Sequence, residues 1–188
     1  MLHQQQFDEL RSYWRELQRQ NDGRVPRRRQ FNPMRVPRLL PYIMLIERRG
    51  EYDLHVRLAG TALEAAAGRS LTGQCYLEFY DESQWGFFAD MTAAMCDQPC
   101  GCRLDREVTF LSGRTMEMHS FNLPFSTEEG EVRYLLGVMA MRRSVHHYGT
   151  ADDNKIKSFM VRDFEFIDLG YGVPVDEQVK AQLAKIPA

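Results

Sequence analysis

The segment from residue 42 to residue 73 places the strongest constraint on how this chain can fold. Residues 42–48 are predicted as a strand and begin with a continuous apolar run at 42–46, residues 52–59 alternate apolar with polar side chains, and a tight turn separates the two. Alternation of period two is typical of a strand with one buried face. An alanine-rich stretch at residues 61–67 follows and stops at Gly68, which predicts a short helix. We therefore expect a strand hairpin that leads directly into a short helix.

The rest of the chain supplies two longer helices and three more strands. Apolar residues recur every three or four positions over residues 5–20, and a second apolar helix is predicted over residues 81–98. Strands are predicted over residues 102–111, 115–125 and 132–142, the first two joined by a Ser-Gly-Arg turn. This order of elements indicates an α+β fold, a five-stranded antiparallel sheet with its helices on one face.

The composition is that of one domain with extensions. The chain has 188 residues, of which 44% are hydrophobic and 27% are charged, so a packed core is expected. We divide the chain into an N-terminal amphipathic helix, an Arg/Pro-rich linker, a central domain and a C-terminal extension, at residues 1–23, 24–38, 39–145 and 146–188. In the extension, residues 159–168 are predicted as one more strand and residues 176–185 as a short helix.

Several spaced residues carry a family resemblance. Residues 14–143 resemble a PAS-type sensor domain, and more narrowly a bacterial PAS-like family with an N-terminal helix that contains a Trp, an LLP strand start and an RLAGT…GxxLTG signature. Such domains sense ligands or dock to partners and rarely catalyse, so the resemblance implies a regulatory role in signal transduction. The matching residues are Trp14, Pro26, Arg28, Asn32, Pro33, Leu39, Leu40, Pro41, Arg57, Leu58, Ala59, Gly60, Thr61, Gly68, Leu71, Thr72 and Gly73.

The cleft between the main helix and the sheet is the candidate ligand pocket. The chain has ten methionines, several of them in this region, which would give a deformable wall suited to a small apolar ligand. A stripe of methionine and aromatic residues is also what a filled core contains, and both interpretations stay open. The residues expected to line the pocket are Phe88, Met91, Met95, Phe110, His119, Phe121, Leu136, Val138 and Met139.

The N-terminal helix is the candidate docking element. In PAS relatives, a helix of this kind packs on the outer face of the sheet or pairs with its copy in a dimer. The resemblance therefore implies a homodimer and a protein partner in a signalling pathway. The apolar face of the helix consists of Phe7, Leu10, Tyr13, Trp14 and Leu17.

An arginine run offers an alternative site for an anion. Arg24 and Arg28 have the R-x-x-x-R spacing of cyclic-dinucleotide-binding PilZ domains, and Arg29 is adjacent. Arginine side chains match phosphate groups, so a cyclic-dinucleotide or other phosphate-ligand receptor is an alternative function. A solvated charge run paired with the many carboxylates is the simpler interpretation. The formal net charge of −2 argues against general nucleic-acid binding.

The cysteines raise the question of a metal or a cofactor. Cys96, Cys100 and Cys102 have a C-x3-C-x-C spacing that differs from the paired C-x2-C of common zinc sites, so no metal is predicted and the question stays open. Flavin-binding PAS relatives carry a G-x-N-C-R-F-L motif, and Cys75 lacks its Asn and Arg neighbours. Haem-binding relatives use a histidine on the main helix, and residues 81–98 contain none. Neither flavin nor haem is expected.

Motifs of common enzymes are missing from the sequence. It contains no G-x-S-x-G, Walker, H-E-x-x-H or G-x-G-x-x-G pattern, so the chain is not expected to be an enzyme. A small cleft enzyme or lipid-type binder with Glu117 or His119 as its base is the alternative from that class. The N-terminus lacks a secretory signal and no apolar run reaches the ~20 residues of a membrane span, so a cytoplasmic protein is expected.

Overall fold

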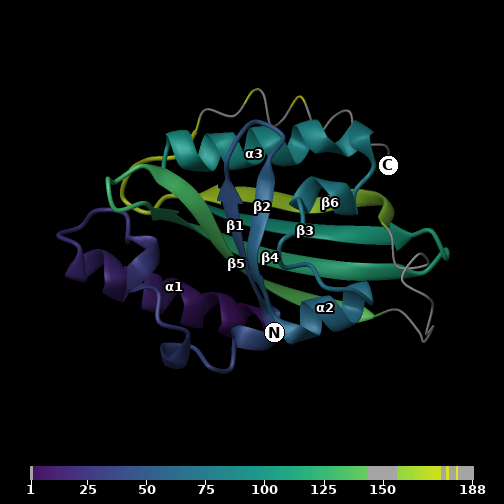
Figure 1. Ribbon diagram of the computed structural model, residues 1–188, viewed down its shortest axis with the longest axis horizontal. Helices are drawn as coiled ribbons and strands as arrows, with labels where there is room; N and C mark the ends of the chain where they lie inside the picture. The colour runs from purple at the N-terminus through teal and green to yellow at the C-terminus, as the bar shows by residue number, and fades with distance from the viewer. Residues whose placement is uncertain (1, 144–155, 175–176, 178–180, 182–188) are drawn as a thin grey trace.

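The computed structural model describes residues 2–143, 156–174, 177 and 181, with three α-helices and six strands (Figure 1). The elements up to residue 143 lie close to their predicted positions, and the helix predicted over residues 176–185 falls almost wholly outside the described residues. None of the described helices is both long and apolar enough to cross a membrane. The elements are α1 (Leu2–Gln20), β1 (Ile43–Arg48), β2 (Leu54–Ala59), α2 (Thr61–Ala67), α3 (Trp85–Asp97), β3 (Gly101–Phe110), β4 (Thr115–Ser126), β5 (Val132–Arg143) and β6 (Ile156–Ile167).

All six strands form one antiparallel sheet in the order β2-β1-β5-β4-β3-β6. The α+β fold class predicted from the sequence is confirmed, with six strands in place of five. The additional strand β6 pairs with β3 along its whole length, from Gly101↔Ile167 to Phe110↔Ile156. Because an uncovered edge strand exposes unpaired N–H and C=O groups, this pairing protects β3. Residues 156–167 of the C-terminal extension are therefore part of the sheet.

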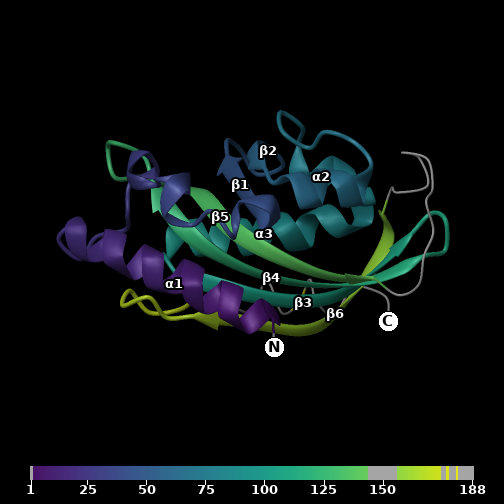
Figure 2. The ribbon, with the colours of Figure 1, turned by 90° about the horizontal axis from the view of Figure 1, so that it is seen from below.

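Helices cover both faces of the sheet. Figure 2 shows α1 along one face, with α2 and α3 on the other. Two apolar clusters result, one between the sheet and α2 with α3, the other between the sheet and α1. The two faces of β4 contribute to different clusters, Met116 to the first and Phe121, further along the strand, to the second. As predicted, α2 and α3 share a face, while α1 closes the opposite one.

The apolar face of α1 is buried against its own sheet. Trp14 is fully buried, and its Nε1 donates a hydrogen bond of 2.8 Å to the carbonyl oxygen of Pro124 in β4. The ring of Phe7 lies 5.6 Å from the ring of Phe121. The face predicted for docking thus packs inside the protein and is not exposed to a second copy. Its remaining members, buried in the same cluster, are Leu10, Tyr13 and Leu17.

The chain that follows β6 also contacts α1. Arg15 Nη1 and Gln18 Nε2 donate hydrogen bonds to the carbonyl oxygen of Leu169, at 2.7 and 3.2 Å, and the Leu169 side chain is fully buried beside α1. Asp168 Oδ1 accepts the N–H of Gly170 at 2.7 Å, and backbone hydrogen bonds of this kind lower the pKa of the Asp168 carboxyl group. The N-terminal helix therefore contacts residues 168–171 of the C-terminal extension.

The RLAGT and LTG motifs meet around α2. Gly60 precedes the helix in close contact with the backbone of Leu40, so that a Cβ at this position would overlap the Leu40 carbonyl oxygen. Gly68 ends the helix with a φ of 68°, a left-handed conformation that favours glycine. Glu64 Oε1 then accepts the N–H of Leu71 at 2.9 Å. These contacts hold α2 and its return loop in place over the sheet.

Candidate functional site

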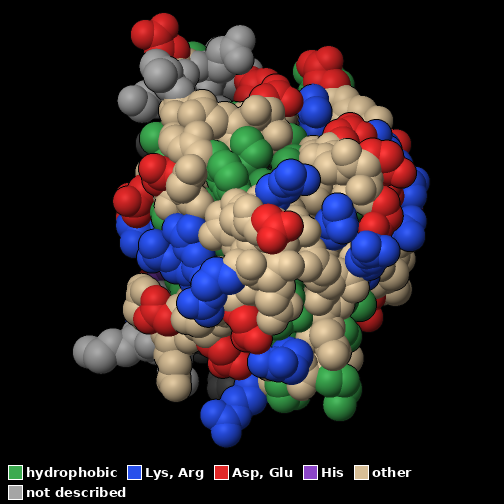
Figure 3. All heavy atoms as spheres, turned by 90° about the vertical axis from the view of Figure 1, so that its left-hand side faces the viewer, with side chains coloured by type: hydrophobic (Ala, Val, Ile, Leu, Met, Phe, Trp, Pro, Cys, Tyr) green, Lys and Arg blue, Asp and Glu red, His purple; other side chains and the backbone are tan. Residues whose placement is uncertain are grey.

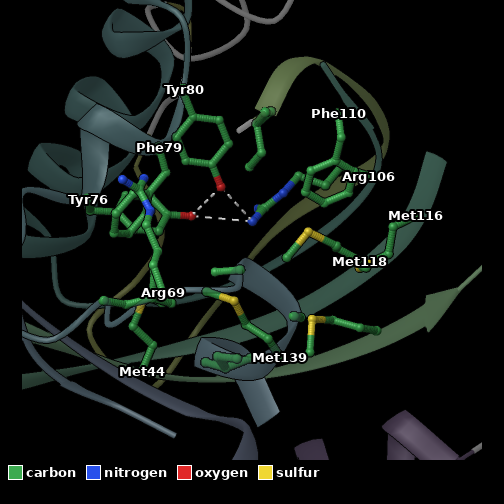
Figure 4. Close-up of a pocket in the computed structure, with 16 residues that line it drawn as sticks. Met44, Arg69, Tyr76, Phe79, Tyr80, Arg106, Phe110, Met116, Met118 and Met139 are labelled. Carbon is green, nitrogen blue, oxygen red and sulfur yellow. Dashed lines mark hydrogen bonds between the residues drawn. The ribbon is translucent and has the colours of Figure 1, made fainter. Parts of the chain in front are cut away.

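A cavity of about 70 Å³ lies between α2, the 3-10 helix at Tyr76–Phe79 and the sheet (Figure 4). Its wall is mostly apolar and contains five methionines, whose flexible side chains allow the wall to adapt to an occupant. Arg69 is exposed to solvent and stands at the rim. The lining residues are Met44, Leu63, Ala66, Ala67, Arg69, Leu71, Tyr76, Phe79, Tyr80, Arg106, Phe110, Met116, Met118, Met139, Met141 and Ile156.

Arg106 supplies the polar corner of the cavity. Its side chain comes from β3, lines the cavity and is only 2% exposed. Its Nη2 donates hydrogen bonds to the hydroxyl oxygens of Tyr80 at 3.0 Å and Tyr76 at 3.3 Å, and those two oxygens lie 2.9 Å apart. Figure 4 shows the three polar groups pointing toward one another, with the methionine side chains beside them. The guanidinium carbon also lies 5.6 Å from the centre of the Phe88 ring.

The charge of Arg106 has no acidic partner within the described part of the chain. Burial lowers the pKa of Arg106, but Tyr76 and Tyr80 oppose it and the net shift is upward, so the guanidinium is charged at neutral pH. Burial raises the pKa of Tyr80 well above its usual value, so Tyr80 is then a neutral phenol and does not neutralise that charge. Arg106 Nε lacks a hydrogen-bond partner among the described residues. Since buried charges are normally paired, the site is electrostatically incomplete.

The structure divides the predicted pocket residues between two faces of the sheet. Phe110 and Met139 line the cavity. The other members on that face pack in the adjoining core, and they are Phe88, Met91 and Met95. Three members lie on the opposite face beneath α1, and they are Phe121, Leu136 and Val138. The expectation that all of them line one pocket is corrected by this geometry, because both faces of β5 are apolar and the apolar side of β4 changes along the strand, from the cavity face at Met116 to the α1 face at Phe121.

The two candidate bases also lie on the outer face of β4. His119 Nδ1 is 3.0 Å from Asp105 Oδ1, and both side chains are partly exposed. Glu117, two residues away on the same face, is exposed. Neither His119 nor Glu117 is among the residues that line the cavity. The structure therefore places no candidate base from the sequence inside the cleft.

Arg106, Tyr76 and Tyr80 are not among the residues predicted from the sequence. A signal for Arg106 is present, since it occupies the same alternating positions of β3 as the buried apolar residues Leu104 and Val108. A charged residue in the apolar phase of a strand indicates a buried charge. No comparable local pattern marks the two tyrosines, which reach the site only because the segment between α2 and α3 folds over the sheet.

The three arginines predicted as an anion site have other neighbours in the structure. Arg29 forms a salt bridge of 2.9 Å with Glu128, and the Arg28 guanidinium lies 5.8 Å from the centre of the Phe31 ring. Arg24 lines a surface hollow whose wall also includes Glu128. On the face shown in Figure 3, Lys and Arg side chains are intermixed with Asp and Glu side chains. The geometry favours a solvated, partly paired charge run.

The clustered cysteines are part of the main core. Cys96, Cys100 and Cys102 are buried, and Cys102 Sγ lies 3.8 Å from the sulfur of Met91. Burial raises the pKa of the Cys96 thiol to about 12, which keeps it protonated at neutral pH. Among the described residues, no group of three His, Cys, Asp or Glu side chains is arranged to hold a metal ion.

These environments predict the order of thiol modification. At pH 7 we expect Ellman's reagent to modify the half-buried Cys75 first, with the three core thiols reacting only after denaturation in guanidinium. The Cys75→Ser variant should then show no rapidly reacting thiol. If the core thiols of the folded protein react rapidly, and if added zinc suppresses that reaction, this prediction is contradicted and a metal site is indicated.

Comparison with known protein families shows which family has this architecture. A family model described as a PAS domain matches residues 2–140. The chain belongs to the PAS domain family. PAS domains are typically sensor domains of signalling proteins. The match begins in α1 and ends within β5, so β6 lies beyond the matched part of this PAS domain. No curated protein matches the chain.

Proposed function

We propose that this PAS domain is a non-catalytic regulatory domain that binds a small ligand in the methionine-lined cavity and signals to a protein partner. The observation that carries the proposal is the cavity, an apolar space with one polar corner formed by Arg106, Tyr76 and Tyr80. Ligand pockets characteristically combine apolar walls with a few convergent polar groups. Membership of the PAS domain family supports a sensory role.

Strand β6 is the proposed route by which the signal leaves the cavity. Ile156, its first residue, lines the cavity, and the buried ring of Phe159 lies 5.6 Å from the ring of Tyr80. Tyr80 also accepts a hydrogen bond from Arg106. A ligand that displaces Tyr80 would therefore change the packing of β6, provided that it binds the two arrangements with different affinities. Because the segment after β6 contacts α1, a change in the packing of β6 would also alter the packing of that segment and of α1.

Homodimerisation, which the family resemblance implies, stays a prediction. The apolar face of α1 is buried in this domain, so a dimer of the folded protein would need another surface. A different protein that binds this domain would likewise need a surface other than the apolar face of α1. The strand β6 and the segment that follows it are the surfaces we propose for such contacts, because Ile156 of β6 lines the cavity and the segment after β6 contacts α1.

Native mass spectrometry of the purified protein tests the proposed function. We expect a mass excess over the denatured protein that disappears on denaturation. In Met118→Trp the larger side chain should occupy the cavity, and we expect the excess to be lost. Met34→Trp is the matched control, because Met34 is 77% exposed and lies outside the cavity, and it should keep the excess.

A bare protein would argue the other way. If the native spectrum shows no excess, and no compound in a panel of small metabolites raises the melting temperature, the sensing proposal is contradicted. The domain would then be a docking module with a filled core.

A further inference from the structure

The charge of Arg106, which has no acidic partner in the described part of the chain, indicates the class of ligand. We propose, as an extension of the proposed function, that the cavity binds a short-chain monocarboxylate whose carboxylate group pairs with Arg106. The guanidinium is buried, lines the cavity and has no acidic partner among the described residues. Its Nε has no hydrogen-bond partner among them either. A carboxylate in the cavity would supply both the missing negative charge and the missing acceptor.

The geometry favours a carboxylate over a phosphate. A guanidinium group presents paired N–H donors in one plane, which match the two oxygens of a carboxylate. The hydroxyl groups of Tyr80 and Tyr76 converge on the same guanidinium nitrogen and add a further donor at that corner. One arginine balances one negative charge, whereas a phosphate dianion would leave uncompensated charge in an apolar cavity. The other arginine, Arg69, packs over the Phe79 ring at 4.9 Å and is exposed at the rim.

The size and walls of the cavity favour a short apolar tail. The cavity measures about 70 Å³. One bound water needs about 10–15 Å³ of such space, so a ligand of about five or six heavy atoms fits. A carboxylate with a tail of two or three carbons has that size. The space beside Arg106 is walled by Met116, Met118 and Met139, which suit such a tail.

Isothermal titration calorimetry with sodium butyrate tests this inference. We expect butyrate to bind the wild-type protein. Butyramide, its uncharged analogue of similar size, should bind more weakly by a factor of about ten or more. Arg106→Met should lower the affinity for butyrate about 10- to 100-fold, because a charged hydrogen-bond donor is lost. The variant is expected to fold, since an apolar side chain of similar volume in place of an unpaired buried charge is generally tolerated.

Arg103→Met is the matched control for Arg106→Met. Arg103 belongs to the same strand but faces the other side of the sheet, where it pairs with Asp163 at 2.6 Å. The Arg103→Met variant should bind butyrate with the affinity of the wild-type protein. Thermal melts give a second measurement and check folding. Butyrate should raise the melting temperature of the wild-type protein and of Arg103→Met, but not that of Arg106→Met.

Four results would overturn the inference. Equal affinities for butyrate and butyramide would show that the ligand charge does not contribute to binding, although the cavity would still be a ligand pocket. If inorganic phosphate binds more tightly than butyrate, the ligand is not a carboxylate. If octanoate binds more tightly than butyrate, the ligand does not have a short chain. If none of these compounds binds but a mass excess persists in the native spectrum, the ligand class is wrong and the proposed function still stands.

Discussion

Replacement of Trp14 by alanine is expected to lower the free energy of unfolding by about 3–5 kcal/mol. Trp14 is among the largest fully buried side chains, and its loss leaves a cavity between α1 and the sheet. The hydrogen bond from its Nε1 to the carbonyl oxygen of Pro124 is lost as well, which leaves a buried acceptor without its donor. Urea denaturation followed by circular dichroism measures the change.

Arg19→Ala is the control for this experiment. Arg19 lies on the same helix but is exposed, so the expected change is within about 0.5 kcal/mol. The mass of both variants by size-exclusion chromatography with light scattering adds a second test. A Trp14→Ala protein that dissociates from a dimer without losing stability would show that α1 serves an interface between copies, and would contradict the packing of α1 on its own sheet.

Gly60→Ala is expected to destabilise the domain by about 3 kcal/mol or more, the upper end of what overpacking costs. The new Cβ would overlap the carbonyl oxygen of Leu40 and the carbonyl group of Pro41. These are backbone atoms, so the clash cannot be relieved by rotating a side chain. The backbone of Gly60 has a φ of −73°, which any residue adopts, and the cost therefore comes from space alone. The denaturation midpoint in urea measures it.

Gly50→Ala provides the comparison for Gly60→Ala. A Cβ at Gly50 would meet only the Asp53 Cβ at an ordinary 3.7 Å. Its effect should stay within about 0.5 kcal/mol, as for surface substitutions generally. Equal midpoints for the two variants would refute a steric requirement for the glycine of the RLAGT motif.

The elements of the fold could be predicted because each has a local cause. The helical spacing of Phe7, Leu10 and Trp14 specifies one apolar face whatever covers it. The turn between β3 and β4 needs a left-handed residue, and Gly113 provides it with a φ of 80°. The additional strand at Ile156–Ile167 was also visible as a local pattern, but its partner strand was not.

The faces of the strands could not be predicted in the same way. Period two reveals the buried side of a strand only when the other side is polar. In β4 the apolar side changes along the strand, from Met116 toward the cavity to Phe121 toward α1. In β5 both sides are apolar, which is why Leu136 and Val138 were expected in the pocket and lie beneath α1.

The strands, the helices and the family follow from local sequence, because propensity, periodicity and turn chemistry act over a few residues and persist in any context. Tertiary packing brings Arg106 to Tyr76 and Tyr80, residues 30 and 26 positions away, and places β6 along the edge of β3. The electrostatic state of a buried charge depends on every element packed around it. No local pattern can report that an arginine lacks an acidic partner among the described residues, and this property defines the candidate site.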